Sequence, residues 1–274
     1  MSNTFEWRQA AIVAAKEWRD RLRNRWLLAV AAIFAVFALA IGYFGAAQQG
    51  QVGFHGIEPT IASLASLVIY LVPLIALILG YDTIVGERER GALELLLSMP
   101  ISRFEILCGK YLGLAAALAS ATALGFGVGV LPLSAQLTVA DGWRYAYFVG
   151  SAILMGWAFL SIALCVSVLA GDRVRASGAA LALWFFFVLV FDLLLMGALV
   201  ASNGGLDSGV FAALLMLNPA DVFRLLNVFG SDQAQGMYGL ATVMPPGWTR
   251  PAALCAVMAA WIALPFTFAY WRFR

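Results

Sequence analysis

Six apolar stretches, each about 20 residues long or longer, run through this sequence of 274 residues. A helix needs roughly 20 mostly apolar residues to cross the hydrocarbon core of a bilayer. The composition agrees, because 63% of the residues are hydrophobic and only 12% are charged, about half the charged fraction of water-soluble domains. The sequence therefore predicts an all-α polytopic membrane protein with six transmembrane helices, at residues 26–46, 60–81, 106–133, 146–170, 176–202 and 252–271.

The basic residues fall almost entirely on one side of these spans. If the six spans alternate in direction, 14 of the 17 Lys and Arg share a side, and Arg144, Arg224 and Arg250 are left on the other. Segments rich in Lys and Arg next to transmembrane helices stay in the cytoplasm. We therefore expect both termini to be cytoplasmic and the protein to lie in a bacterial inner membrane.

Residues 1–25 precede the first span and are expected to form a separate interfacial helix, with residues 26–274 as the six-span domain. At 100° per residue, five side chains form one apolar stripe: Trp7, Ala11, Ala14, Trp18 and Leu22. Most basic residues lie away from this stripe, but Arg21 does not fit the pattern. This arrangement is typical of an amphipathic helix along the membrane surface; a cytosolic helix packed on a partner is the alternative.

The connection at residues 82–105 is the most highly charged one. Pro100 disfavours helical geometry in the residue before it, so a first helix at 87–97 should end there. Ser102 followed by Glu105 is a capping box, which predicts that the third span begins at Arg103. The helix at 87–97 is amphipathic and is either a solvated loop helix or a docking element for a cytosolic partner.

The connection at residues 203–250 is long and lies on the outer side. Its apolar run at 210–217 reaches only about 12 Å as a helix, which is too short to span. Asn218 as N-cap, Pro219 at the first helical position and Asp221 in the first turn predict a second helix at 219–229. We expect two short periplasmic helices on the outer surface.

A few residues inside the spans stand out. Asp192 lies within the fifth span, where a carboxylate costs about 2.5 kcal/mol or more. It should hydrogen-bond a neighbouring helix or line an outward-facing vestibule, and no cationic partner can be named from sequence. Gly109 and Gly113 form a GxxxG pattern that favours close helix contact. Packing roles are also expected for Gly125, Gly127 and Gly129.

No pattern for catalysis or metal binding is present. His55 is the only histidine, and the three cysteines, Cys108, Cys165 and Cys255, are far apart. Three methionines of the outer connection give only a weak indication of soft-metal binding: Met216, Met237 and Met244. We expect no cofactor and no metal in this chain, and no enzymatic activity of its own. An integral-membrane enzyme such as a lipid transferase would need clustered Asp or His, and a purely structural anchor is a further alternative.

The block from Tyr81 to Arg103, followed by Gly109 and Lys110, resembles the cytoplasmic signature segment of the type-2 ABC exporter permeases. The resemblance implies a homodimer whose six spans follow an N-terminal elbow helix. It also implies a separate cytosolic ATPase, which binds ATP and Mg²⁺ and receives the coupling helix of segment 82–105. The residues expected to couple to that ATPase are Glu87, Arg88, Glu89, Gly91, Leu93, Glu94, Pro100 and Arg103.

Further blocks, at 23–28, 60–67, 187–195 and 217–227, resemble a subgroup of these permeases that supports copper-site maturation of nitrous oxide reductase. This implies two ATPase copies and a periplasmic accessory protein that exchanges with a copper chaperone and the reductase. Contact with that protein is expected at Asn218, Pro219, Asp221 and Arg224. The chain would pass a sulfur species or couple motion mechanically; an exporter of a drug, lipid or ion is the alternative.

Overall fold

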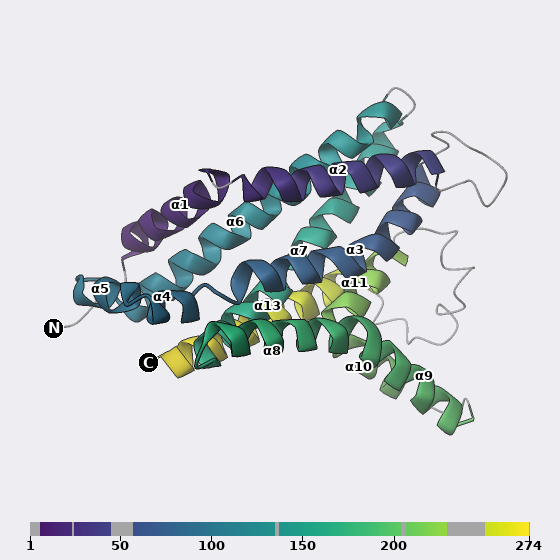
Figure 1. The fold of residues 1–274 in the computed structure, drawn as a ribbon. Helices are drawn as coiled ribbons and strands as arrows, with labels where there is room; N and C mark the ends of the chain where they lie inside the picture. The colour runs from purple at the N-terminus through teal and green to yellow at the C-terminus, as the bar shows by residue number, and fades with distance from the viewer. Residues whose placement is uncertain are drawn as a thin grey trace.

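The structure is a computed structural model, and it describes residues 6–23, 25–44, 57–134, 137–203, 207–228 and 250–273. His55, Met237 and Met244 lie outside the described residues. The described part is helical, without strands, and forms an elongated bundle (Figure 1). Six helical segments are long and apolar enough to cross a membrane, which confirms the predicted number. They are α2 (Trp26–Phe44), α3 (Ile57–Gly80), α6 (Arg103–Val130), α7 (Val139–Leu169), the continuous segment Arg173–Ala201, and α13 (Pro251–Phe273).

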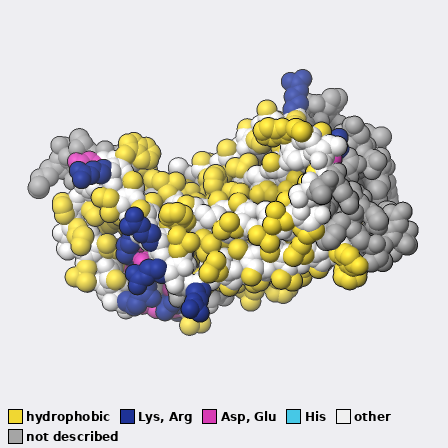
Figure 2. Space-filling model, turned by 90° about the horizontal axis from the view of Figure 1, so that it is seen from above, with side chains coloured by type: hydrophobic (Ala, Val, Ile, Leu, Met, Phe, Trp, Pro, Cys, Tyr) yellow, Lys and Arg dark blue, Asp and Glu magenta, His cyan; other side chains and the backbone are white. Residues whose placement is uncertain are grey.

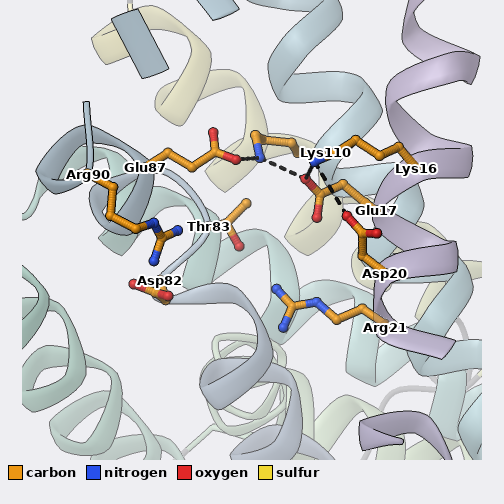
Figure 3. A pocket seen from close by; sticks show the side chains of 9 residues that line it. All are labelled: Lys16, Glu17, Asp20, Arg21, Asp82, Thr83, Glu87, Arg90 and Lys110. Carbon is orange, nitrogen blue, oxygen red and sulfur yellow. Dashed lines mark hydrogen bonds and ion pairs between the residues drawn. The ribbon is translucent and has the colours of Figure 1, made fainter. Parts of the chain in front are cut away.

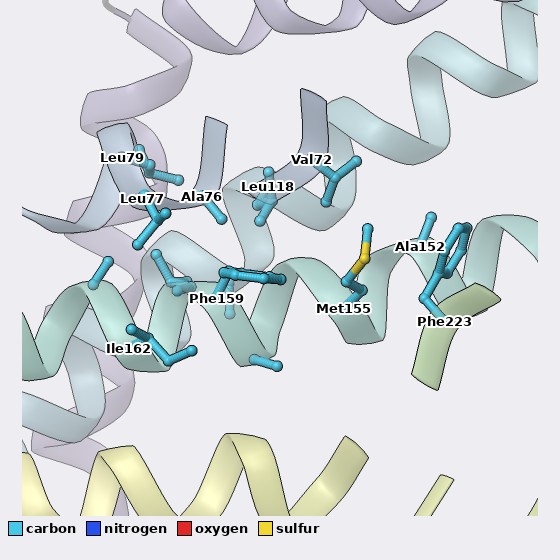
Figure 4. Packing of buried hydrophobic residues seen from close by; sticks show 14 of the residues in the cluster. Val72, Ala76, Leu77, Leu79, Leu118, Ala152, Met155, Phe159, Ile162 and Phe223 are labelled. Atoms are coloured by element: carbon cyan, nitrogen blue, oxygen red, sulfur yellow. The ribbon is translucent and has the colours of Figure 1, made fainter. Parts of the chain in front are cut away.

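Helix α7 is the centre of the bundle. It packs against α3, α6 and α13, and 67% of its most apolar window is buried, the largest share among the six spans. Met155 and Phe159 are fully buried, and Figure 4 shows side chains of α3 and α6 next to them on one side of α7. Burying large apolar side chains on one helix stabilises each by about 1.5–3 kcal/mol when the alternative is water. In lipid, tight packing takes over that role.

The first helix, α1 (Trp7–Arg23), lies along α6. The glycine pattern explains this pairing, because a Cβ added to Gly109 or Gly113 would lie 2.7 or 2.6 Å from backbone oxygens of α1. The predicted apolar stripe of α1 points away from the protein: Trp7 is 68% exposed and Trp18 is 38% exposed. The GxxxG pattern therefore does mark a close helix contact, as predicted, and its partner is α1.

Helix α2 packs farther along the same helix α6. A Cβ on Gly125 or Gly129 would meet Phe34 or Ala38 of α2, whereas Gly127 faces open space. Gly127 therefore packs against no other helix within the described chain. Successive residues i and i+2 point to different sides of a helix, so Gly127 turns away from the face that Gly125 and Gly129 present to α2.

The fifth span is not one regular helix. It consists of α8 (Arg173–Phe185), the π-helical segment η3 (Phe186–Val190) and α9 (Phe191–Ala201). In Figure 1, α9 leans away from the rest of the bundle. Only 11% of the most apolar window of this span is buried, the lowest share of the six. A π-turn shifts the register of the backbone hydrogen bonds and often marks a functional site.

The segments predicted to share one side of the membrane do lie together. Figure 1 places both termini, α1, α4 (Val85–Glu89) and α5 (Ala92–Ser98) at one end of the bundle. Figure 2 shows most Lys and Arg of the visible face gathered at this same end, with hydrophobic side chains over the middle. We call this the basic end of the bundle, and the opposite end the outer end.

Candidate functional site

The charged segment at the basic end forms two short helices. A single helix at 87–97 was predicted, and this is wrong, because the chain breaks between α4 and α5 at Gly91. Gly91 has φ 70°, a left-handed conformation that glycine adopts without the penalty of a Cβ. The break lets α4 and α5 take separate directions. The capping box of Ser102 and Glu105 is present as predicted, and α6 begins at Arg103.

A buried ion cluster lies behind α4. Lys110 of α6 is 2% exposed, and its ammonium lies 2.6 Å from a carboxylate oxygen of Glu87 and 2.9 Å from one of Glu17. Figure 3 shows the three side chains meeting, from α4, α1 and α6. Removing a charge of this kind from water is costly unless it is paired and hydrogen-bonded. Lys110 meets that condition only while α1 and α4 both stay in place, so the cluster joins three elements.

A second set of contacts holds α4 against the end of α7. The hydroxyl of Ser167 accepts hydrogen bonds from the backbone N–H groups of Ile84 (2.9 Å) and Val85 (3.1 Å). Helix α4 has no side-chain cap at its N-terminus. Ser167 supplies the missing acceptor from another helix, because the first N–H groups of a helix have no partner within it.

Two arginines, Arg88 of α4 and Arg173 of α8, complete the attachment. Arg88 donates to the carbonyl oxygens of Ala170 (3.2 Å) and Val168 (3.5 Å). Arg173 pairs with Asp82 at 2.5 Å, and its backbone N–H donates to Glu89 at 2.8 Å. Helix α4 is thus bound to α1, α6, α7 and α8.

The remaining residues predicted to couple to an ATPase have different surroundings. Leu93 is buried, and Arg103 donates to the carbonyl oxygen of Phe273 at 2.9 Å. Glu94 and Pro100 are exposed. Next to Glu94, the apolar Leu95 is 70% exposed, although sequence analysis did not select it. Helix α5 therefore presents an exposed surface, while α4 is the part fixed within the chain.

The intramembrane carboxylate Asp192 has a cationic partner. Arg224 of α11 (Pro219–Val228) lies 3.0 Å from Asp192 and 2.6 Å from Asp221. Asp221 is 1% exposed, whereas the side chains of Asp192 and Arg224 are each more than one-third exposed. The pair confirms that Asp192 faces a neighbouring helix. One cation thus serves two carboxylates, at the start of α9.

The Asn-Pro start of α11 forms as predicted but in a different place. Ala220 N–H donates to the Asn218 side chain at 3.0 Å, and Asn218 Nδ2 donates to the carbonyl oxygen of Phe187 at 2.8 Å. Phe187 lies in the π-helical segment, so Asn218 binds an acceptor at the irregular part of the fifth span. Sequence analysis could not find this bond, because a π-turn has no clear sequence signature.

Helix α11 does not lie on the outer surface, contrary to prediction. It is bent by 112° from α10 (Ser208–Met216) and packs among α3, α7, α13 and η3. Its apolar residues Val222 and Phe223 are 0% exposed, which explains why the helix enters the bundle. Asn218, Pro219 and Asp221 are buried within the chain, so contact with a periplasmic protein through these three would require α11 to move.

Lys110 and Glu17 are the main residues that sequence reasoning missed. Lys110 was counted with the cytoplasmic connection, yet it lies two turns into α6 and is almost fully buried. A lysine inside a helix between Gly109 and Gly113 was the available signal, since a site of close helix approach excludes water. Among the described residues, no three His, Cys, Asp or Glu are grouped to hold a metal ion.

Two comparisons agree with this architecture. Residues 11–274 match the family model described as "ABC-2 family transporter protein". The chain belongs to the ABC-2 family of transporter proteins. The match covers nearly the whole chain, so the charged end and the outer cluster both lie within the family domain.

Two curated relatives are similar over the full length. The chain is 44% identical over 268 residues to the "Probable ABC transporter permease protein NosY" of Pseudomonas aeruginosa and 44% identical over 269 residues to that of Stutzerimonas stutzeri. In both cases 96% of each chain is covered. Both relatives are named as ABC transporter permeases, and this chain is similar to them over nearly its whole length.

Proposed function

We propose that this permease transmits the motion of a cytosolic ATPase dimer through the membrane, with both termini in the cytoplasm of a bacterial inner membrane. The observation that carries the proposal is the contrast between α4 and α5. Helix α5 exposes Glu94 and Leu95, and Met99 follows it directly; Leu95 is 70% and Met99 52% exposed. Exposed apolar side chains beside a charge fit a docking surface for another protein.

Because α4 is bound to several helices, a displacement of α5 would be transmitted to the rest of the bundle. A displacement of α5 would move α4 through the short connection at Gly91. Helix α4 is bound to α6 through Lys110 and to α7 through Ser167. Tightly packed elements move as rigid bodies rather than deform continuously. Closure of the ATPase subunits on ATP would therefore shift α1, α6 and α7 together.

On the outer side, the motion would reach the cluster of Asp192, Asp221 and Arg224. This cluster joins α9 to α11, and Asn218 joins α11 to the π-helical segment. Helix α9 leans from the bundle and is joined to α11 by this partly exposed ion pair, so we propose that the pair breaks and α9 takes a second position during the cycle. A ligand or partner that favours one arrangement then shifts the equilibrium between them.

For the process served, we propose copper-site maturation of nitrous oxide reductase. The names of the two relatives support this assignment. The working complex would then contain two copies of this chain, two NosF-like ATPase subunits and a NosD-like periplasmic protein, which would exchange with a NosL-like copper chaperone and the reductase. Mechanical coupling fits better than passage of a charged cargo, because the described spans carry charge only near their ends and in the outer cluster.

One feature favours the alternative of an exporter for a drug, lipid or ion. A pocket of about 230 Å³ lies between α9, α10 and α11, with Leu195, Leu199 and Phe211 as apolar walls. Asp192 and Arg224 also line the pocket. Such a mixture of apolar walls and few polar groups is typical of ligand sites. A small sulfur species or an amphipathic molecule could occupy it.

The test uses the exposed surface of α5 in the reconstituted complex. Leu95→Asp should abolish co-purification of the ATPase subunit and the dependence of ATP hydrolysis on the permease, without unfolding the chain. Val139→Asp is the matched control, because Val139 is 81% exposed at the N-terminus of α7, where an acid is tolerated. Normal assembly and normal hydrolysis with Leu95→Asp would contradict the proposal.

A further inference from the structure

A polar pocket of about 210 Å³ lies at the basic end, between α1, α4 and α6 (Figure 3). It is separate from the exposed surface of α5. Nine side chains line it: Lys16, Glu17, Asp20, Arg21, Asp82, Thr83, Glu87, Arg90 and Lys110. Four of these are acids and four are bases, so the charge that a ligand meets depends on which of them are already paired.

Every acid of the pocket has a cationic partner within the chain. Glu17 and Glu87 share Lys110, and Asp20 pairs with Lys16 at 3.4 Å. Asp82 pairs with Arg173, which does not line the pocket. The acids of the pocket are therefore largely compensated without its two arginines.

Arg21 and Arg90 are the two lining charges without a partner. Neither guanidinium group has an ion pair or hydrogen bond with any described residue. Figure 3 shows their guanidinium groups reaching into the pocket from opposite walls, with Thr83 between them. Thr83 is 5% exposed, and its hydroxyl has no hydrogen-bond partner in the described structure. A buried unpaired hydroxyl is costly, typically by about 1–3 kcal/mol.

The position of Arg21 also explains an exception in the sequence. Arg21 departs from the lipid-facing and polar stripes of the N-terminal helix because it lies one turn after Glu17, on the face that meets the protein. Arg21 is half-buried on that face, and the nearby Glu17 and Asp20 are paired with Lys110 and Lys16.

We infer that this pocket binds a phosphate group, held by Arg21, Arg90 and the hydroxyl of Thr83. Guanidinium groups bind phosphate oxygens in a bidentate manner, and two of them opposite each other suit a tetrahedral anion. The unpaired Oε2 of Glu87 requires a donor, which a hydroxyl on or beside the phosphate provides. The inference goes beyond the coupling role and does not depend on it.

Two sources offer this chemistry. One is the headgroup of an anionic phospholipid such as phosphatidylglycerol, which carries hydroxyls next to its phosphate. The pocket adjoins α1, whose exposed tryptophans are typical of a helix at the membrane surface. The other is a soluble phosphate. The headgroup would tie the interfacial helix α1 to α4 through the lipid.

The experiment measures thermal unfolding of the full chain, with the subunits that co-purify, in nanodiscs. Discs of phosphatidylcholine alone are compared with discs of phosphatidylcholine and phosphatidylglycerol in equal parts. Inorganic phosphate is titrated into the first kind, with chloride at the same ionic strength as control. Arg21→Gln and Arg90→Gln are compared with Arg19→Gln, an exposed position of α1 that does not line the pocket.

A rise in Tm in the phosphatidylglycerol discs alone supports a lipid headgroup, and a saturable rise with inorganic phosphate supports a soluble anion. In each pocket variant, the apparent affinity for the lipid or for inorganic phosphate, read from the rise in Tm, should be roughly tenfold weaker. In Arg19→Gln it should be unchanged. Thr83→Val, which keeps the side-chain shape, gives the same test if an arginine variant does not fold. No rise in either system, or an equal loss in Arg19→Gln, would overturn the inference.

Discussion

The ammonium of Lys110 lies 2.6 Å from a carboxylate oxygen of Glu87, and the lysine side chain is 98% buried. The pair joins the third membrane span to the short helix α4, and Glu17 extends it to α1. Such a cluster contributes little net stability relative to an apolar core of the same shape. Its use is to fix which elements move together.

Replacement of Lys110 by methionine should destabilise the chain strongly. The change leaves Glu87 buried without a cation and Glu17 with only Lys16, whose ammonium lies 3.9 Å away. Loss of a partner from such a buried cluster costs about 3–5 kcal/mol. Thermal unfolding in detergent measures the loss. The triple variant Lys110→Met/Glu17→Gln/Glu87→Gln removes all three charges and should recover a large part of it. Equal destabilisation in the single and triple variants would show that packing, rather than charge, is decisive here.

Local sequence signals predicted the start of α6 and of α11 correctly. The capping box of Ser102 and Glu105 and the Asn218-Pro219 start depend on neighbours within three residues, so the pattern alone is sufficient. The break at Gly91 was missed because the charged residues before it and the leucines after it together fit one amphipathic helix. A single glycine does not reveal from sequence whether its φ is positive.

Contacts between distant segments account for the rest. Asp192 and Arg224 are 32 residues apart, and Lys110 and Glu17 are 93 apart. Charge and burial predict that such residues need partners, but not which ones, because the partner depends on how helices pack. Similarly, the polar start of α11 suggested a surface helix, whereas its apolar residues 222 and 223 fill the bundle.

Removal of Arg224 should be more harmful than removal of Asp192. The pair of Asp192 and Arg224 is more than one-third exposed, so Asp192→Asn should cost about 1 kcal/mol or less. Arg224→Met also leaves Asp221 without a cation, and Asp221 is 1% exposed, so the expected loss is about 3 kcal/mol. Unfolding temperatures of the two variants give the comparison. A larger effect of Asp192→Asn would mean that Asp192 supports more than this pair.

Close contact between α1 and α6 can be tested with one added methyl group. A Cβ at Gly113 would lie 2.6 Å from the carbonyl oxygen of Ala14 and from Glu17 Cβ. Backbone cannot yield easily, so Gly113→Ala should separate the helices, weaken the contact of Lys110 with Glu17 and cost about 1–3 kcal/mol. Gly127→Ala on the same helix meets nothing within 4 Å and should be neutral or slightly stabilising. Equal Tm values for both variants would contradict the role given to Gly113.

The orientation of the bundle can be tested with two single cysteines. Leu95 and Val139 are both highly exposed and lie on opposite sides of the spans. The three native cysteines are buried or half-buried, so the protein without an added cysteine should be labelled only weakly. A membrane-impermeant maleimide should label Val139→Cys in intact spheroplasts and Leu95→Cys only after lysis. We expect this result because segments rich in Lys and Arg stay in the cytoplasm, and Leu95 lies on the side of the membrane that carries most of these residues. If Leu95→Cys reacts in intact spheroplasts and Val139→Cys does not, α5 faces away from any cytosolic ATPase, and neither docking at Leu95 nor transmission through Lys110 is tenable.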